Sequence, residues 1–241
     1  MASTPKTAII TGASRGIGAG LVESFLERGY NVVANSRNIT KVNRLTDSSA
    51  IALVEGDIGS REIAAKVTDI AITQFGSIDV LVNNAGIFDA KPFTEYTTDD
   101  FNAFISTALA GFFYVSQLAV KQMLLQQSGS IVNISTSLVD QPIAGVPAAL
   151  PIMTKAGLNA VTRGLAIEYA KQGIRINTVS AGIIDTTMHQ PESHEFLKSL
   201  HPVDRIGKVK EVVDAVLFLT DATFTTGGVL HVDGGAHAGR W

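Results

Sequence analysis

Short apolar, β-branched runs alternate along the chain with longer segments in which apolar residues recur at three and four positions. A short apolar run bounded by turn residues is typical of a buried strand, and the three-and-four spacing is typical of an amphipathic helix. Segments such as 17–28 and 156–171 therefore predict helices. The runs predict seven strands, at residues 7–11, 31–36, 50–57, 78–86, 129–136, 173–180 and 227–235.

Regular alternation of strands and helices predicts the α/β class, with a seven-stranded parallel sheet covered by helices on both faces. No linker rich in Pro, Ser or Gly, no repeat and no low-complexity block interrupts the pattern. We therefore expect one doubly wound, Rossmann-type domain over residues 1–241, with a short substrate-lid segment at about 185–205.

Composition narrows the function. With 241 residues, 46% of them hydrophobic, and a formal net charge of −3, the chain can bury a large core and has no basic footprint for nucleic acid. Absence of cysteine excludes disulfides, thiolate catalysis and cysteine metal sites. We find neither a signal-peptide pattern nor an apolar run long enough to span a bilayer. We expect a cytoplasmic protein with a small-molecule substrate that binds neither membranes nor nucleic acid.

The sharpest chemical signal is "TGASRGIG", residues 11–18, at the first junction between a strand and a helix. Gly12, Gly16 and Gly18 allow the backbone to turn tightly and to approach a pyrophosphate, toward which the following helix directs its free N–H groups. A glycine-rich turn alone is weak evidence, because structural turns often hold several glycines. Here a second motif, "NNAG" at residues 83–86, closes the fourth strand at the same edge of the sheet.

Together these motifs resemble those of the classical short-chain dehydrogenase/reductase family, and the resemblance runs from Lys6 to about Gly235. "TGASRGIG" fits the family's Thr-Gly-x-x-x-Gly-x-Gly at every fixed position, and "GSIVNIS" resembles its fifth strand. "GIRINTVSAGIIDTTM" resembles the segment that folds over the nicotinamide, with Ala181 in place of the usual proline. The resemblance implies a nicotinamide cofactor contacted by Gly12, Ser14, Arg15, Gly16, Ile17, Gly18, Ser36, Arg37, Asp57, Ile58, Asn83, Ala85, Gly86, Lys155, Gly182, Ile184, Thr186 and Met188.

Charge at the end of the second strand favours NADP(H) over NAD(H). An NAD-binding site usually offers a carboxylate to the ribose hydroxyls, whereas a 2′-phosphate requires cations. Ser36 stands where we expect the acid, Arg37 follows it, and Arg15 lies in the glycine turn. The alternative is that both arginines are ordinary solvated charges. Asp57 resembles the residue that contacts adenine, or else it caps the helix that begins near residue 60.

The family's chemistry uses a tyrosine as general acid/base, a lysine four residues later that lowers the tyrosine pKa, and a serine that binds the substrate oxygen. Here Lys155 is the lysine, but the tyrosine position holds Pro151. The serine aligns with Thr136 or Ser137, because the following loop is a residue or two longer than usual. The family's water-ordering asparagine is replaced by Ala108. We expect Lys155, Thr136 and Ser137 to form what remains of the catalytic group.

No other tyrosine is a good replacement. Tyr30 begins a strand, Tyr114 and Tyr169 fit helix faces, and only Tyr96, in a loop, could approach the site. A helix that starts near residue 151 tolerates proline, because an N–H in its first turn has no helical partner.

Other polar residues have two interpretations each. His189 could supply a proton near neutral pH or be a surface residue of the lid, and Asp140 could bind a cationic nitrogen or cap a turn. His231 alternates with apolar residues in the last strand, which indicates a structural role. We expect no metal site, because His194, His201 and His237 show no ligand spacing.

Two functions follow from this site. The first is an NADP(H)-dependent oxidoreductase that transfers hydride to a small carbonyl or to an imine or iminium. Addition to an iminium gives a neutral amine directly, so it needs no proton donor in the transition state. The second is an NADP(H)-binding protein without catalysis that acts as a sensor or partner subunit. Retention of Lys155, Thr136 and Ser137 favours the enzyme. The family resemblance and the long helical segments 99–127 and 156–171 favour a homotetramer over a homodimer.

Overall fold

The computed structural model describes residues 4–41, 48–187 and 194–239 and contains the predicted parallel sheet. Every pairing is parallel, and the strand order is β3-β2-β1-β4-β5-β6-β7. The order reverses between β1 and β4, which is the switch point where ligands bind in such sheets. The strands are β1 (Thr7–Thr11), β2 (Asn31–Ser36), β3 (Ile51–Glu55), β4 (Val80–Asn83), β5 (Gly129–Thr136), β6 (Ile174–Ala181) and β7 (Val229–Val232).

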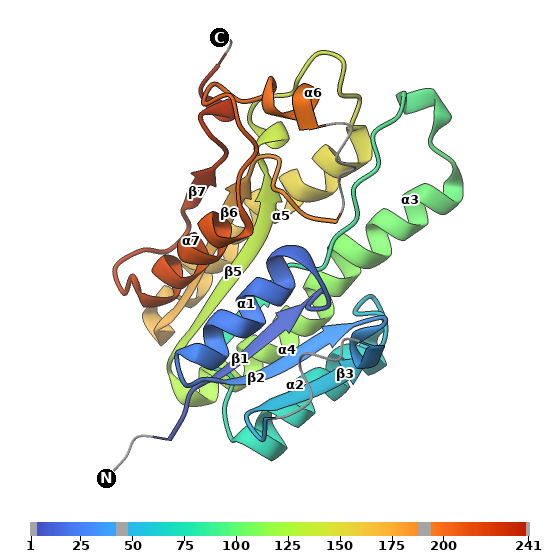
Figure 1. Ribbon diagram of the computed structural model, residues 1–241. Helices are drawn as coiled ribbons and strands as arrows, with labels where there is room; N and C mark the ends of the chain where they lie inside the picture. Colours follow the sequence, from blue (N-terminus) through green and yellow to red (C-terminus); the bar gives the residue numbers. More distant parts are fainter. Residues whose placement is uncertain (1–3, 42–47, 188–193, 240–241) are drawn as a thin grey trace.

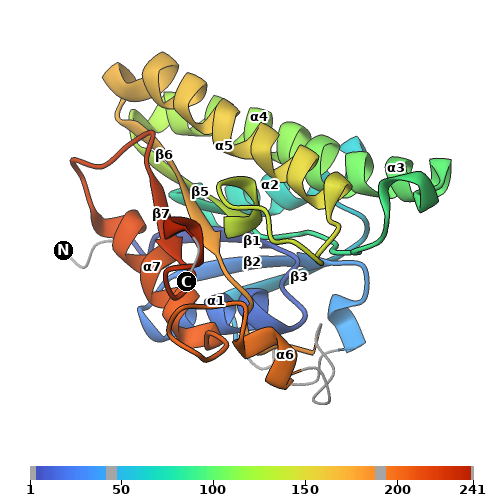
Figure 2. The ribbon, with the colours of Figure 1, turned by 90° about the horizontal axis from the view of Figure 1, so that it is seen from above.

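Helices cover both faces of the sheet (Figures 1 and 2), as predicted. Figure 2 shows α2, α4 and α5 on one face and α1 and α7 on the other. The helices are α1 (Gly16–Glu27), α2 (Arg61–Phe75), α3 (Thr98–Phe104), α4 (Gly111–Gln126), α5 (Ala149–Tyr169), α6 (His194–Lys198) and α7 (Val209–Asp221). Short α6 lies within the predicted lid segment, next to residues 188–193, which are outside the described residues.

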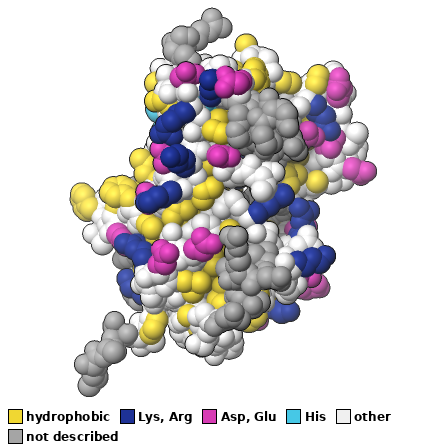
Figure 3. Space-filling view, in the orientation of Figure 1, with side chains coloured by type: hydrophobic (Ala, Val, Ile, Leu, Met, Phe, Trp, Pro, Cys, Tyr) yellow, Lys and Arg dark blue, Asp and Glu magenta, His cyan; other side chains and the backbone are white. Residues whose placement is uncertain are grey.

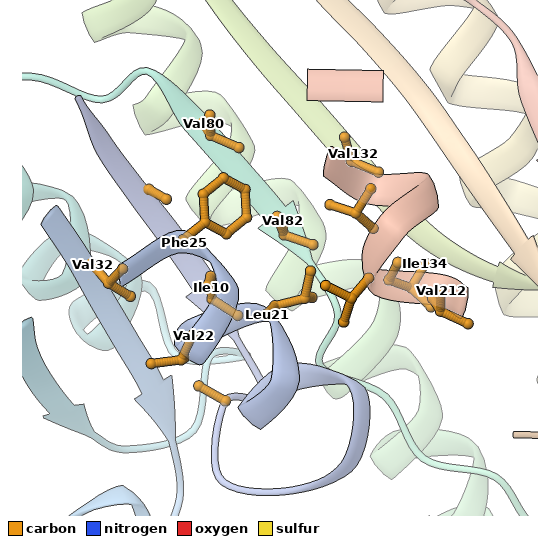
Figure 4. Close-up of a cluster of buried hydrophobic side chains, with 14 of the residues drawn as sticks. Ile10, Leu21, Val22, Phe25, Val32, Val80, Val82, Val132, Ile134 and Val212 are labelled. Atoms are coloured by element: carbon orange, nitrogen blue, oxygen red, sulfur yellow. The ribbon is translucent and has the colours of Figure 1, made fainter. Parts of the chain in front are cut away.

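Two hydrophobic cores lie on the two faces of the sheet. Neighbouring residues of a strand point to opposite faces, so Ile10 belongs to the core under α1 and α7, while Ile9 belongs to the core under α2, α4 and α5. Figure 4 shows the first core, where Phe25 of α1 lies over the strands with Ile10 and Val82 nearby. Burial on both faces explains why these strands are continuously apolar in sequence.

The predicted helix at 99–127 is not a single regular helix. A π-helical segment, Ile105–Ala110, joins α3 to α4, and it includes Ala108. The whole run Thr98–Gln126 is long and apolar enough, by length and composition alone, to cross a membrane, a test that a buried core helix also passes. This run packs on α2 and α5, and buried residues such as Val115 and Met123 explain much of its apolar character.

Candidate active site

A cavity of about 780 Å³ lies along the carboxyl edge of the sheet, where the strand order reverses. It is lined by the glycine turn after β1, the ends of β2, β4, β5 and β6, the start of α5, and α6. Of the residues that the sequence predicts at the site, all except Asn83 and Met188 line this cavity. Met188 lies outside the described residues, as does His189.

The glycine turn is fixed to the "NNAG" segment by hydrogen bonds. The Thr11 hydroxyl accepts from the backbone N–H of Asn84 (3.1 Å) and of Ala85 (3.0 Å). The Asn84 side-chain amide donates to the carbonyls of Thr11 (2.9 Å) and Gly12 (3.1 Å). The two motifs therefore form one rigid unit at the switch point.

Glycine is required sterically in this turn. Gly12 adopts a positive φ of 66°, and a Cβ placed there would lie 2.8 Å from Ala85 Cα. A Cβ on Gly18 would lie 2.1 Å from the Gly12 carbonyl oxygen. Arg15, which precedes α1, makes no side-chain capping bond, so the first N–H groups of α1 face the cavity without a side-chain cap. This geometry fits the binding of a pyrophosphate.

The part of the cavity next to the end of β2 carries cations. Arg15 and Arg37 are exposed and line the cavity, together with half-buried Ser36 at the end of β2. Ser36 accepts a hydrogen bond from Asn38 N–H (3.4 Å). Asp57 also lines the cavity, and its carboxylate accepts from Gly59 N–H (2.9 Å). Ser60, not Asp57, is the N-cap of α2, so the alternative role of Asp57 as a helix cap was wrong.

Lys155 of α5 lines the cavity. Its Nζ donates to the Ile134 carbonyl (2.7 Å), and a Cβ on Gly86 would approach Nζ to 3.3 Å. Burial lowers the Lys155 pKa to about 8, because the charged form is poorly solvated. β4 pairs with β5 only as far as Asn133. Ile134 is the next residue of β5, and its carbonyl accepts the hydrogen bond from Lys155.

Thr136 and Ser137 both line the cavity, and the structure retains both as candidates. Thr136 ends β5, and its hydroxyl accepts from Leu138 N–H (3.4 Å). Ser137 is buried and begins a 3-10 turn, Ser137–Val139. Each hydroxyl is therefore positioned by the strand-to-turn junction at the end of β5.

Pro151 is the third residue of α5 and lines the cavity. The regular helical bonds begin immediately after it, where Ile152 N–H donates to the Ala148 carbonyl (2.9 Å). Proline in the first turn therefore costs no helical bond, as predicted. Ala108 is buried and does not line the cavity, although its neighbour Thr107 does.

Tyr96, the tyrosine that the sequence allows to approach the site, does not reach the cavity. Its OH donates to the Asp89 carbonyl (2.7 Å), and the residue does not line the cavity. Asn83, which the sequence predicts at the cofactor, does not line the cavity either. Its amide donates to Ser116 (3.0 Å) and Asn133 (2.8 Å) in a buried network, because Asn83 is still within β4. Asn84, the next residue, was missed although it belongs to the same motif.

Three histidines, His201, His231 and His237, contact nearby protein groups. His231 Nε2 lies 3.0 Å from the Asp140 carboxylate, and its ring stacks on His237 with centroids 3.7 Å apart. His237 in turn lies 2.8 Å from Asp233. His201, which lines the cavity, accepts from Ile183 N–H (3.0 Å), and burial lowers its pKa. Among the described residues, no group of His, Asp and Glu could hold a metal ion.

One part of the cavity wall is apolar. It is formed by residues of the loop after β4, of the turn and loop between β5 and α5, and of α6 and the residues that follow it. Among them are Phe88, Leu138, Ile143, Val146, Phe196 and Leu200. This wall fits a substrate with a substantial apolar surface.

The chain is similar in sequence and in structure to known oxidoreductases. A family model described as enoyl-(acyl carrier protein) reductase matches residues 12–237. The chain is 30% identical to a 3-oxoacyl-(acyl-carrier-protein) reductase of Buchnera aphidicola, over 98% of this chain and 99% of that protein. It is 33% identical to 3beta-hydroxysteroid dehydrogenase 1 of Eggerthella lenta, over 95% and 93%. The structure of ElxO with NADP bound superposes with a TM-score of 0.90 at 34% identity, covering 98% of this chain and 100% of ElxO.

Proposed function

The chain belongs to the short-chain dehydrogenase/reductase family, and on that premise we propose an NADP(H)-dependent oxidoreductase that reduces a small carbonyl or an imine or iminium without a tyrosine acid. The observation that carries this proposal is the cavity wall around Lys155, where Pro151 stands one helical turn before the lysine. The rest of the site, from the glycine turn to Thr136, keeps the groups that would bind the cofactor and orient the substrate.

The preference for NADP(H) is supported by two arginines at the adenosine end of the cavity. Arg15 and Arg37 are exposed there, and no ion pair to either guanidinium occurs among the described residues. Ser36 offers a hydroxyl where a carboxylate would repel a 2′-phosphate. The ElxO structure with NADP bound agrees with this preference.

Lys155 is proposed to hold the nicotinamide ribose and to place positive charge beside the reacting centre. Its Nζ is already oriented by the Ile134 carbonyl, at 2.7 Å. Thr136 or Ser137 would donate a hydrogen bond to the substrate oxygen or nitrogen. When bound, the cofactor supplies the hydride, while these side chains bind, orient and exclude water.

Loss of the tyrosine is the reason to include C=N⁺ substrates. Reduction of a ketone develops an alkoxide, and loss of a general acid costs about 10²–10⁴ in rate. Hydride addition to an iminium gives a neutral amine directly, so no proton is delivered in the transition state. The apolar wall formed by residues such as Phe88 and Ile143 would then hold the hydrocarbon part of the substrate.

The proposal is tested by NADPH oxidation with matched ketones and cyclic iminium ions of the same carbon skeleton. We expect turnover of the iminium compounds to exceed that of the ketones, and Lys155→Ala to abolish it. Ketone turnover at or above the iminium rate would contradict the unusual proton handling.

One specific observation favours a second function, a non-catalytic NADP(H) sensor or partner subunit. Neither Pro151 nor buried Ala108 carries a polar side chain where the family has its acid and its asparagine. A protein that binds NADPH tightly but turns over no substrate class would support this second function.

We also propose that the chain assembles as a homotetramer.

A further inference from the structure

Among the described residues, three buried side-chain oxygens on α5 and on the strands it covers have no hydrogen-bond partner. They belong to Ser135 (4% exposed), Ser180 (0%) and Asn159 (5%), and the atoms concerned are the two serine Oγ atoms and Asn159 Oδ1. Buried polar atoms are nearly always hydrogen-bonded to protein or to ordered water. A polar group bound between such atoms would satisfy them if they lie close together.

The two serines lie side by side and point toward α5. Ser135 and Ser180 are Cα partners in the pairing of β5 with β6. The residues before them, Ile134 and Val179, belong to the core on the α1 and α7 face. Because successive side chains alternate between the two faces, both serine side chains point to the other face, which α5 covers.

The contacts of Thr162 fix the position of α5 over these strands. Its hydroxyl accepts from the Asn133 amide (2.9 Å) and shares a hydrogen bond with the Thr178 hydroxyl (2.9 Å). Asn133 and Thr178 are Cα partners two residues before the serines. The helix of a βαβ crossover runs back along the sheet, so earlier residues of α5 lie over later residues of the strands.

Asn159 therefore lies over the serine pair. It precedes Thr162 by three residues and follows Lys155 by four, so the three share one side of the helix. Lys155, one turn closer to the cavity, donates to the carbonyl of Ile134, which is peptide-bonded to Ser135. The three unpartnered atoms thus lie directly behind the lysine.

We propose that Ser135, Ser180 and Asn159 bind an ordered water that supports the charged ammonium of Lys155 from the sheet side. A water bridging two hydroxyls and an amide has three partners, the usual number for a buried water. Ser135 also lines the cavity, so it connects this hydration site to the region of the lysine. All three side chains are positioning residues that act on Lys155.

This site explains how Lys155 can stay charged without the family's asparagine. Ala108 carries no amide to order a water on the α4 side, and desolvation already lowers the Lys155 pKa to about 8. A polar group near the ammonium favours the charged form. The role of the charged lysine in cofactor binding rests on the proposed function, whereas the water site and its effect on the lysine do not.

The test measures Lys155 directly in the cofactor-free protein. The ε-carbon resonances of ¹³C-labelled lysine are followed against pH, and Lys155→Met identifies the signal. We expect the double variant Ser135→Ala/Ser180→Ala to lower the Lys155 pKa by on the order of one unit. Ser130→Ala is the matched control, because Ser130 Oγ is equally buried and unpartnered on β5 but near the opposite end of the strand.

A crystal structure of the wild-type protein supplies the second readout. We expect density for a water within hydrogen-bond distance of Ser135, Ser180 and Asn159. The proposal is overturned if that site holds no water, if the double variant leaves the Lys155 titration unchanged, or if Ser130→Ala shifts it equally. Failure of NADPH to bind would instead overturn the proposed function, because neither readout uses the cofactor.

Discussion

At the scale of single residues, Pro151 has the largest chemical consequence. It forms part of the cavity wall one helical turn before Lys155, so a side chain at this position faces the substrate region. Pro151→Tyr should place a hydroxyl there, and the nearby ammonium would favour the tyrosinate and lower its pKa. We expect ketone reduction to rise by about 10²-fold or more, measured as kcat/KM for NADPH-dependent turnover.

The control for this change is a cyclic iminium ion, whose reduction rate we expect to be nearly unaffected by Pro151→Tyr. Adding Ala108→Asn tests whether the two missing groups couple, since a rate gain above the product of the single effects reports an interaction. No gain in ketone reduction in either variant would show that Pro151 does not replace a general acid.

Lys155 should impose a pH limit on cofactor binding. Burial lowers its pKa from 10.5 to about 8, so the ammonium that is proposed to hold the ribose loses its proton as pH rises through that value. We expect NADPH affinity to be highest below pH 8 and to fall above it, measured by fluorescence titration from pH 6 to 10. In Lys155→Met the affinity should be weak, and its fall above pH 8 should disappear. If the affinity of Lys155→Met still falls above pH 8, the fall is caused by the titration of another group.

Arg37 should set the cofactor preference. Two exposed guanidiniums line the cavity, that of Arg37 after β2 and that of Arg15 in the glycine turn. Arg37→Ala removes the first of them. We expect NADPH affinity to fall by about 10- to 100-fold, the value of a hydrogen bond to a charged group, with little change for NADH. Lys41→Ala, a neighbouring exposed cation that does not line the cavity, is the control. Equal affinities of the wild-type protein for NADPH and NADH at physiological salt would contradict the assignment.

At the scale of elements, the glycine turn and the "NNAG" segment behave as one unit. Gly18→Ala would place Cβ 2.1 Å from the Gly12 carbonyl oxygen, so the turn must shift and its bonds to Asn84 must distort. We expect a loss of about 1–3 kcal/mol in stability and weaker NADPH binding, measured by thermal unfolding with and without cofactor. Gly164→Ala in α5, whose Cβ would meet nothing within 4 Å, should leave binding unchanged. Unchanged binding in Gly18→Ala would separate the turn from the cofactor site.

Strands and helices whose apolar residues follow a regular pattern were predictable from the sequence. Local departures from that pattern were not. Runs such as Thr7–Thr11 predicted their strands to the residue, because burial on both faces requires continuous apolar residues. The π-helical segment at Ile105–Ala110 was missed, because one extra residue per turn barely changes the apolar pattern. Asn83 and Asn84 are identical side chains one residue apart, and only the end of β4 decides which one reaches the cavity.

In the candidate site, too, the positions that follow from a local sequence pattern were predictable and the others were not. Residues at strand ends were predictable, since parallel strands bring their carboxyl ends to one edge. Ser135, Ser180 and Asn159 were not predicted, because their proximity depends on the register of β5 with β6 and on the position of α5. Neither the strand register nor the position of the helix can be read from the apolar pattern of a single segment.

At the scale of the whole molecule, two exposed apolar surfaces lie on opposite faces of the sheet. The first surface, on α4 and α5, includes Leu125 and Ile167, which are 80% and 83% exposed. The second surface, at α7 and the turn before β7, includes Phe218 and Phe224. Figure 3 shows hydrophobic side chains gathered on the side that carries α7 and β7. Exposed apolar patches of this kind mark interaction sites.

Two independent self-complementary surfaces generate a tetramer with two-fold axes, whereas one generates only a dimer. We therefore expect a homotetramer by light scattering at micromolar concentration. Ile167→Glu should place a charge in the first surface and give dimers held by the second, and Phe218→Glu should give dimers held by the first. The double variant should be monomeric, because both surfaces then carry a buried charge. Glu168→Gln, beside Ile167 and exposed, should remain tetrameric, and a monomeric wild-type protein would contradict the assembly.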